Sequence, residues 1–387
     1  MAALKDPEVE VDSTRALIQH WRIFRLVGLH PPDGATWWGR HYRIYSIVWN
    51  FIFHICILTS FVVNFLLSNS LESFCESLCV AMPHTLYMLK LVNVGRMRRK
   101  MMHSNRLLRH LDGRLNCDQE RRVIKEGVAQ ANFFFRQTGR GFVCVIIVGI
   151  LYVIISSERT LMYPTWVPWN WQSSSTSVFV ATATAHSMAI IENALVVLNL
   201  CTYPDTYLIM LSAHTKALAW RVSRLGHDSR QTREEVYQRL IGCIRDHQTI
   251  LNLFRLLEES LSMTCFLQFF CTAGIQCTIC YFLVFEQIGI MRFLNMLFLL
   301  MALTSETLLL CYISELVCQA GDNLLAAAYS CNWLDQPVHF RRLLVFMLLY
   351  CQKPLILVAG VVPVSMNTFL AVCKGGYTML TLLNDMR

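Results

Sequence analysis

The chain has 387 residues, of which 55% are hydrophobic and only 16% are charged. Soluble domains carry about 25% charged residues, so this composition indicates a membrane protein and argues against a soluble enzyme or binding domain. The net charge of +8 would suit a nucleic-acid partner, but the basic residues lie in blocks between apolar runs, which is the pattern of cytoplasmic loops. We therefore expect this chain to lie in a lipid bilayer and to bind no nucleic acid.

Six apolar runs follow a polar start in chain order. Residues 1–44 lack the short apolar core and cleavage site of a signal peptide, so we expect the first apolar run to act as the insertion signal. A membrane-spanning helix needs about 20 apolar residues. The runs are Tyr45–Leu67, Phe74–Val94, Gly141–Ser157, Ser177–Leu200, Leu261–Phe285 and Phe293–Ile313. Ionisable residues interrupt the second and the fourth run, which makes these two the weaker candidates for membrane spans.

A seventh apolar region, Leu343–Leu383, is too long for one span. As a single helix it would measure about 60 Å, twice the thickness of the hydrocarbon layer. Proline and glycine residues between 354 and 363 offer places to break it. The alternatives are two spans, eight in total, or a cytoplasmic anchor helix over about 343–360 followed by one span over about 364–386. We predict the second arrangement.

The distribution of Lys and Arg predicts the orientation, because cytoplasmic loops are enriched in them. Residues 94–140 hold twelve and residues 201–257 hold eight, whereas the alternate connections at 158–176 and 286–291 hold one and none. Residues 1–44 hold six. The predicted fold class is an all-α membrane protein with seven transmembrane helices, a cytoplasmic amino terminus and an extracellular carboxyl terminus, the last helix being split into cytoplasmic and membrane parts.

This orientation argues against the other classes of multi-span protein. A G-protein-coupled receptor has its amino terminus outside and usually carries a Cys, an acidic-Arg pair and an Asn-Pro motif at set places, none of which this chain has in place. A secondary transporter usually shows paired inverted halves, and we find no internal repeat. No phosphate-binding loop or nucleophile motif indicates an enzyme.

Several segments, in this order and spacing, resemble the insect odorant receptor family, above all the receptors of fruit flies. The opening HWRIFRLVGLHPP looks like the cytoplasmic start of that family. The others are TYLIMLSAHTKALAWRV (Thr206–Val222), DHQTILNLF (Asp246–Phe254), AAAYSCNW (Ala326–Trp333) and PVSMNTFLAVCKGGYTMLTLL (Pro363–Leu383). The gustatory receptors are an alternative. They usually end in a Thr-Tyr…Gln-Phe pattern, which Tyr377 and Thr378 followed by Asn384 and Asp385 fit poorly.

The resemblance implies a function and an assembly. The family forms tetrameric ligand-gated cation channels, in which an odorant-tuning subunit joins a shared co-receptor in the plasma membrane of olfactory neuron dendrites and cilia. The co-receptor has an extended loop between spans four and five; here Cys201–Glu259 is short, so this chain resembles a tuning subunit. The implied parts are a cytoplasmic start (1–44), a ligand-binding region (45–342) with cytoplasmic loops at 94–140, 201–259 and 314–342, and the anchor and pore helices (343–387).

The resemblance also implies an odorant pocket in the outer half of spans two to six. Mapping by depth alone gives candidates on spans two, three and four, of which we expect about a third to touch ligand. The candidates are Met82, Thr85, Met88, Gly149, Tyr152, Val153, Ser156, Thr184, His186, Ser187 and Ile190. Small residues such as Thr184 and Ser187 equally suit helix packing. Because no Lys or Arg for an acid and no acidic cage for an amine lies among them, we expect a neutral, bulky apolar volatile such as a terpenoid or an ester.

The last span is expected to line the pore. Aligned from the carboxyl end with the family's last helix, Leu382 and Met386 match the apolar gate positions and Asp385 matches a polar pore position. A carboxylate there would favour cations. The alternative is that Leu382 packs against neighbouring helices and Asp385 caps the helix.

Ionisable residues inside predicted spans are functional candidates in their own right. We expect Lys90 to extend to the inner membrane boundary and Glu306 to be satisfied by its neighbours Thr304 and Ser305. His186 and Glu192, six residues apart, do not share a helix face. Most cysteines lie inside apolar runs as small hydrophobic residues, and their spacing predicts neither a metal site nor a cofactor.

Overall fold

Helices make up nearly all the regular structure in the computed structural model, which describes residues 11–31, 37–156, 158–285 and 289–385. The α-helices are α1 (Ile18–Leu26), α2 (Trp37–Asn50), α3 (Cys56–Leu66), α4 (Leu71–Asp112), α5 (Asp118–Ile155), α6 (Thr176–Ser223), α7 (Arg233–Phe285), α8 (Ile290–Ser330), α9 (Val338–Cys351) and α10 (Met366–Asp385). The shorter elements are a 3-10 helix, η1 (Ser13–Leu17), a π-helix, η2 (Phe51–Ile55), and the strands β1 (Val358–Ala359) and β2 (Val362–Pro363).

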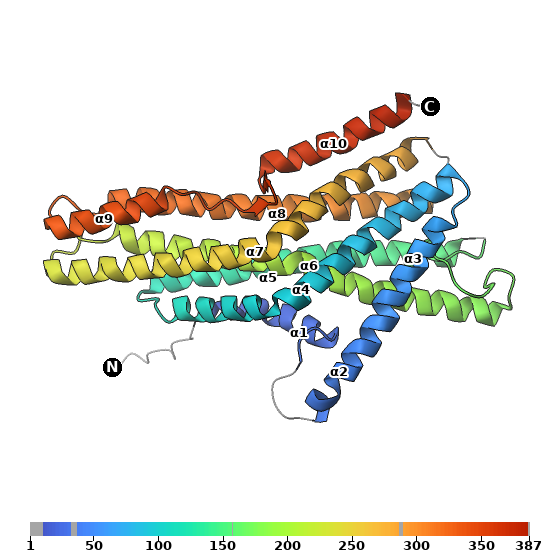
Figure 1. Cartoon of the computed structure of the whole chain (residues 1–387), viewed down its shortest axis with the longest axis horizontal. Coiled ribbons are helices and arrows are strands. Elements are labelled where there is room, and N and C mark those ends of the chain that lie inside the picture. The colour runs from blue at the N-terminus through green and yellow to red at the C-terminus, as the bar shows by residue number, and fades with distance from the viewer. Residues whose placement is uncertain (1–10, 32–36, 157, 286–288, 386–387) are drawn as a thin grey trace, which may run out of the picture.

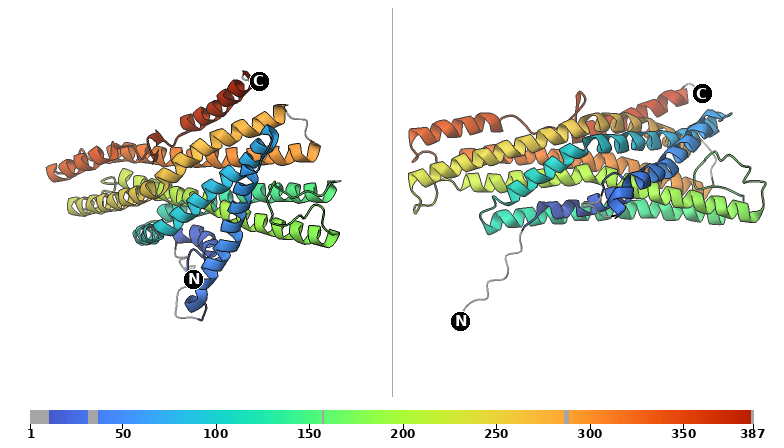
Figure 2. Two further views of the ribbon diagram at one scale, coloured as in Figure 1. Left: turned by 45° about the vertical axis from the view of Figure 1, so that its right-hand side comes forward. Right: turned by 60° about the horizontal axis from the view of Figure 1, so that its bottom comes forward.

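The long helices α4 to α8 run lengthwise through the molecule and make it elongated (Figures 1 and 2). With 42 residues in α4 and 53 in α7, these helices measure about 63 and 80 Å at 1.5 Å per residue. The hydrocarbon layer is only about 30 Å thick. Each of these helices is therefore much longer than a single crossing of that layer requires.

The basic segments expected as loops are mostly helical. Residues 94–140 form the end of α4 and the start of α5, and residues 201–259 form the end of α6 and the start of α7. In this part α6 is buried all round: Tyr207, Leu208 and Met210 are at most 1% exposed. A helix that is enclosed on every face needs no polar side. We call this part of the bundle the helical extension; it comprises residues 94–140, 201–259 and 314–342 with α9.

Five stretches of the described residues are long and apolar enough, by length and composition, to cross a membrane. They are His41–Leu66, which runs from α2 through η2 into α3, and parts of α5, α6, α7 and α8. The weaker predicted span at 74–94 lies within α4, and the predicted span at 364–386 overlaps α10. The count of seven spans and the orientation of the termini remain predictions.

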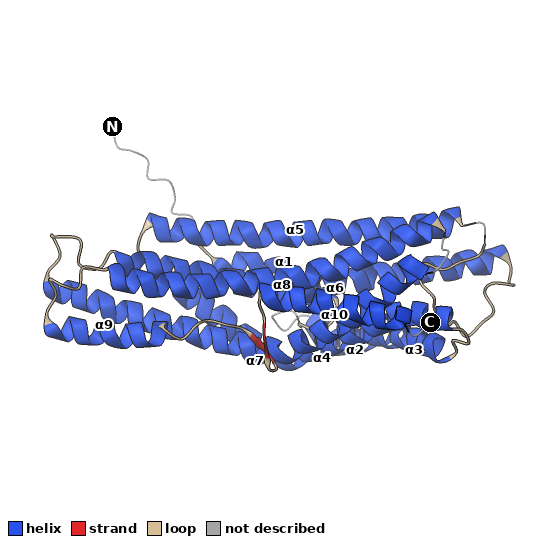
Figure 3. Cartoon of the chain, turned by 90° about the horizontal axis from the view of Figure 1, so that it is seen from above, coloured by secondary structure: helices blue, strands red, loops and turns tan. Residues whose placement is uncertain are grey.

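The last apolar region is divided by a β-hairpin. α9 ends at Cys351, short of the 360 expected, because Pro354 cannot continue the helix. β1 and β2 then pair antiparallel beside α7 (Figure 3), and Gly360 in their two-residue turn has φ +64°, a conformation that favours glycine. The Gly360 N–H donates to Ser262 Oγ at 2.9 Å and ties the turn to α7. The break thus separates α9 from α10, which leaves the bundle at an angle in Figure 1.

The core of the helical extension contains a buried ion network around Arg221 of α6. Its guanidinium donates to both carboxylate oxygens of Glu120, at 2.9 and 2.7 Å, and to Asp246 Oδ2 at 2.5 Å. Arg114 pairs with the other Asp246 oxygen. Glu120 and Asp246 are 1% and 3% exposed. Two of the segments that carry the family resemblance, which contain Arg221 and Asp246, therefore meet here.

The segment before α1 is attached to the helical extension through Ser13. The Ser13 hydroxyl donates to Asp112 Oδ1 at 2.6 Å and lies 2.8 Å from His214 Nε2, and its N–H donates to Asp112 Oδ2 at 2.9 Å. Burial lowers the pKa of His214 to about 3 and raises the pKa of Asp112 to about 6. His214 is therefore neutral at pH 7 and acts as a hydrogen-bonding group between the segment and α6.

Candidate functional site

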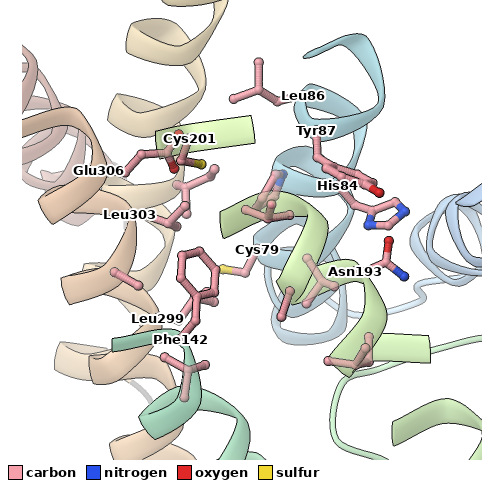
Figure 4. Close-up of a pocket in the computed structure, with 18 of the residues that line it drawn as sticks. Cys79, His84, Leu86, Tyr87, Phe142, Asn193, Cys201, Leu299, Leu303 and Glu306 are labelled. Carbon is pink, nitrogen blue, oxygen red and sulfur yellow. The ribbon is translucent and has the colours of Figure 1, made fainter. Parts of the chain in front are cut away.

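A cavity of about 170 Å³ lies among the predicted spans (Figure 4). Five long helices supply most of its wall, and α3 and the connection between α5 and α6 close it. The lining residues are Cys79, Val80, Pro83, His84, Leu86, Tyr87 and Lys90 of α4; Phe142, Val145 and Ile146 of α5; Ile190, Asn193, Ala194, Val197, Leu200 and Cys201 of α6; Gln268, Thr272 and Ile275 of α7; Leu299, Ala302, Leu303 and Glu306 of α8; Phe61 of α3; and Met162 and Tyr163 of the connection.

The wall is mainly aliphatic and aromatic, with few polar groups at its ends. Enclosed sites of this composition bind small apolar molecules, with the polar groups setting the orientation. An engineered apolar cavity of about 150 Å³ holds benzene. The cavity can therefore hold a molecule of about one ring or a short hydrocarbon chain.

Lys90 lies in the wall of this cavity. Its ammonium group donates to Glu306 Oε1 and to Gln268 Oε1, both at 2.6 Å, and the Lys90 and Glu306 side chains are 12% and 13% exposed. The expectation that Glu306 relies on its neighbours in the sequence was wrong, because its partner Lys90 lies on another helix. Each charge is expensive inside a membrane, so their pairing within the bundle is the cheaper arrangement.

A second polar cluster lies behind the wall formed by α4 and α6. The Tyr87 hydroxyl is 2.9 Å from His54 Nδ1, and Glu192 Oε1 accepts from Trp49 Nε1 at 2.9 Å. His54 Nε2 lies 3.8 Å from the same Glu192 oxygen. The π-helix η2, an element often found at functional sites, contains His54 and joins α2 to α3. Glu192 thus finds its partners on the first span and, as expected, not in His186.

Of the eleven pocket candidates, all of which the structure describes, Ile190 lines the cavity. Val153 packs against a buried cluster that contains the lining residues Phe61, Met162 and Ile190. Gly149 affects the cavity wall indirectly. A Cβ at this position would lie 2.3 Å from Met162 Cε, so the glycine leaves room for the side chain of Met162, which lines the cavity.

The remaining candidates lie elsewhere. Met82 packs toward Gly274, Met88 packs against the main core, and the Thr85 hydroxyl donates to the Ala81 carbonyl at 2.7 Å. Thr184 is exposed on the outside of the bundle and His186 is buried outside the cavity wall, while three others are half-buried away from that wall. Those three are Tyr152, Ser156 and Ser187.

Depth mapping missed most of the lining residues. Residues such as His84 and Tyr87 are on the expected helices, but one or two positions along from the candidates. Others, such as Met162 and Tyr163, come from a connection that carries no apolar periodicity. The available clue was the ionisable residues Lys90 and Glu306 inside predicted spans, because such residues usually mark a functional site.

The predicted gate lies at the limit of the described residues. α10 ends at Asp385, and Met386 is outside the described part of the chain. The side chains of Leu382 and Asp385 are outside it as well. Within the residues that are described, no group of three His, Cys, Asp or Glu side chains is close enough to hold a metal ion.

Comparison with known proteins identifies the family. Residues 70–377 match the family model described as 7tm Odorant receptor. The chain is 62% identical to odorant receptor 19a and to putative odorant receptor 19b of Drosophila melanogaster, in each case over 379 residues and 98% of both chains. The resemblance predicted from the sequence is therefore confirmed.

The fold has counterparts among solved structures. The olfactory receptor OR5 from Machilis hrabei superimposes with a TM-score of 0.82 at 16% identity, covering 96% of this chain and 98% of that one. The structure of the same receptor in complex with eugenol superimposes with a TM-score of 0.78, covering 95% and 97% of the two chains. At this identity the likeness concerns the helical fold alone. Because the family model matches most of its length and the two Drosophila receptors are 62% identical to it, the chain belongs to the 7tm odorant receptor family.

Proposed function

We propose that this chain is the odorant-tuning subunit of a heteromeric ligand-gated, non-selective cation channel, formed with the odorant co-receptor in the plasma membrane of olfactory sensory neuron dendrites. The observation that carries this proposal is the apolar cavity among the predicted spans, in a chain that belongs to the odorant receptor family. A gustatory-receptor-like channel and, less consistent with the predicted orientation, a receptor of the G-protein-coupled type are the alternatives. The short connection between α6 and α7 supports the tuning role.

A neutral apolar volatile suits the cavity best. Lys90 and Glu306 neutralise each other there, so neither offers an unpaired charge to an acid or an amine. The volume of about 170 Å³ favours a compact molecule over the bulkiest terpenoids and esters. The Machilis receptor, a neighbour in fold, has been solved with eugenol, which is also a small neutral molecule.

The co-receptor is proposed to dock on the helical extension. Tyr329, Leu334 and Phe346 are 69%, 70% and 61% exposed there, around the end of α8 and along α9. Exposed aromatic and aliphatic side chains among charged neighbours suit a protein interface. Phe254, at the end of the segment Asp246–Phe254 that resembles the family, is 8% exposed and belongs to the core of the chain itself, so it is not part of this proposed interface.

The pore proposal rests on the family resemblance of the last helix. α10 has 20 residues, about 30 Å of helix, which is enough to cross the hydrocarbon layer. We propose that Leu382 and Met386 form an apolar gate and that Asp385 favours cations near its outer end. The amino terminus would then be cytoplasmic and the carboxyl terminus extracellular.

Co-expression tests the function directly. Cells that express this chain with the co-receptor are expected to carry an odorant-evoked cation current, recorded by voltage clamp against a panel of neutral volatiles. Cells that express the chain alone are expected to show none, because the pore of the proposed channel needs both kinds of subunit. A robust odorant current from the chain alone would contradict the heteromeric proposal.

Filling the cavity tests where the ligand binds. Ile190→Trp places a larger ring in the wall of the cavity and is expected to raise the half-maximal odorant concentration about tenfold or more, a loss of ~1.4 kcal/mol or more of binding energy. The control is Met188→Trp, since Met188 on the same helix is 63% exposed. Surface labelling should show both variants at the membrane. Equal odorant sensitivity of the two variants would place the ligand elsewhere.

A further inference from the structure

One end of the cavity holds two buried polar atoms without hydrogen-bond partners. They are His84 Nε2 on α4 and Asn193 Oδ1 on α6, in side chains that are 8% and 5% exposed and that both line the cavity. Figure 4 shows these two side chains together on one side of the cavity, with Glu306 and Cys201 on the other. A buried polar atom without a partner is costly, so such an atom in a binding site favours a ligand that satisfies it.

The orientation of the Asn193 amide is set by its own contacts. Its Nδ2 donates to the Phe53 carbonyl at 3.1 Å and to the Ala189 carbonyl at 2.7 Å. Both amide hydrogens are therefore used on the protein backbone, and rotation of the amide would place the oxygen against two other acceptors. The remaining group, Oδ1, can only accept a hydrogen bond.

The His84 ring is held in place by aromatic neighbours. It meets Phe61 edge-on with 5.2 Å between ring centroids and lies 5.1 Å from the Tyr87 ring. The Tyr87 hydroxyl makes no hydrogen bond to His84 Nε2 and lies 2.9 Å from His54 Nδ1 instead. The His84 ring also hydrogen-bonds the backbone carbonyl of His54, which uses the one N–H of the neutral imidazole, so Nε2 presents a hydrogen-bond acceptor to the cavity.

At the opposite end of the cavity, the polar groups of Lys90, Glu306 and Gln268 already bond to one another. There the Lys90 ammonium already donates to Glu306 and Gln268 at 2.6 Å. The wall between the two ends is apolar. A ligand therefore gains most from one polar group at the end formed by His84 and Asn193 and hydrocarbon over the rest of its surface.

We propose that the ligands of this cavity are small apolar volatiles that carry one hydroxyl group, an alcohol or a phenol. The hydroxyl donates its one hydrogen to Asn193 Oδ1 or to His84 Nε2, which are both acceptors. An ether or ester oxygen only accepts, so it satisfies neither atom. This inference rests on the proposed function in one respect, namely that the cavity is the odorant site. It adds the chemical class of the ligand.

Binding of matched probes to the full-length chain in lipid nanodiscs tests this. Toluene, p-cresol and 4-methylanisole share one ring and differ in carrying no hydroxyl, a free hydroxyl and a methyl-capped one. Competition against a fluorescent apolar probe is expected to show p-cresol binding about tenfold or more tighter than the other two, because a site built to hydrogen-bond a hydroxyl rejects the analogue that lacks it. Equal affinities, or no displacement by p-cresol, would overturn the inference.

Two variants assign the preference to its residues. His84→Phe keeps an aromatic ring against Phe61 and Tyr87, and Asn193→Leu keeps the branched shape of the side chain. The variant that removes the acceptor of the hydroxyl is expected to bring the affinities for p-cresol and toluene to within about threefold while toluene still binds. The control is His186→Phe, the same change at a buried histidine outside the cavity wall, which should keep the preference. A p-cresol preference that survives both variants would overturn the assignment.

The assay separates this inference from the channel proposal. It measures binding to the chain without the co-receptor, so it does not depend on a current. A preference for p-cresol in a chain that gives no odorant current with the co-receptor would contradict the channel and leave the ligand class standing. Odorant currents from a chain that binds toluene and p-cresol equally would support the channel proposal and contradict the ligand class.

Discussion

Lys90→Met is expected to remove most of the chain from the cell surface. The change leaves the Glu306 carboxylate in the membrane-spanning bundle without the ammonium group that now lies 2.6 Å away. Removing one partner of a buried ion pair typically costs about 3–5 kcal/mol, because the other charge remains buried and unpaired. Surface labelling, together with size-exclusion chromatography of the full-length chain in detergent, measures the loss of folded protein.

A double variant and an exposed pair serve as controls. Lys90→Met with Glu306→Met removes both charges and should recover much of the folded fraction, since replacing a whole buried pair with apolar residues is often neutral. Lys100→Met breaks an ion pair with Glu259 of the same 2.6 Å length, but with side chains 39% and 59% exposed, and should cost at most about 1 kcal/mol. If the single and double variants fold equally poorly, the pair does not account for the loss.

Arg221→Met is expected to unfold the helical extension and abolish assembly with the co-receptor. It would leave the carboxylates of Glu120 and Asp246 buried close to one another, with only Arg114 to offset them. A loss of about 3–5 kcal/mol is expected by the same argument, and like charges in a buried site add to it. The measurements are thermal unfolding of the purified chain and co-purification with the co-receptor.

Arg122→Met is the matched control for Arg221→Met. Arg122 pairs with Glu126 at 3.0 Å on the surface of α5, where the two side chains are 72% and 65% exposed. Such a pair contributes a few tenths of a kcal/mol, so stability and assembly should be unchanged. If Arg221→Met melted at the same temperature as this control, the network at the end of α6 would not stabilise the extension.

Much of the architecture could be predicted from local properties of the sequence. Apolar runs predicted helices at the positions of α4 to α8, and the proline and glycine residues after 353 indicated that the last region is interrupted. The family was evident from short segments such as those containing Arg221 and Asp246. These features depend on residues close together in the chain, so no packing information is needed to find them.

The cavity wall depended on packing that no local pattern encodes. On α4 the predicted residues Met82 and Thr85 stand on either side of the lining residues Pro83 and His84 in the sequence. Each residue turns a helix by about 100°, so an uncertainty of one position in its rotation exchanges one face for another. Depth along the membrane can be read from hydropathy, but rotation is set by the neighbouring helices.

By itself the sequence determined that this is a helical membrane protein of the odorant receptor family, because composition, apolar runs and short motifs are local properties. Only the tertiary structure decided that Lys90 pairs with Glu306, 216 positions further along, and that His84 and Asn193 share one end of a cavity. The physical reason is that a charge or polar atom in the membrane is stabilised by whichever group the helix packing brings within hydrogen-bonding distance, and that group lies on another helix.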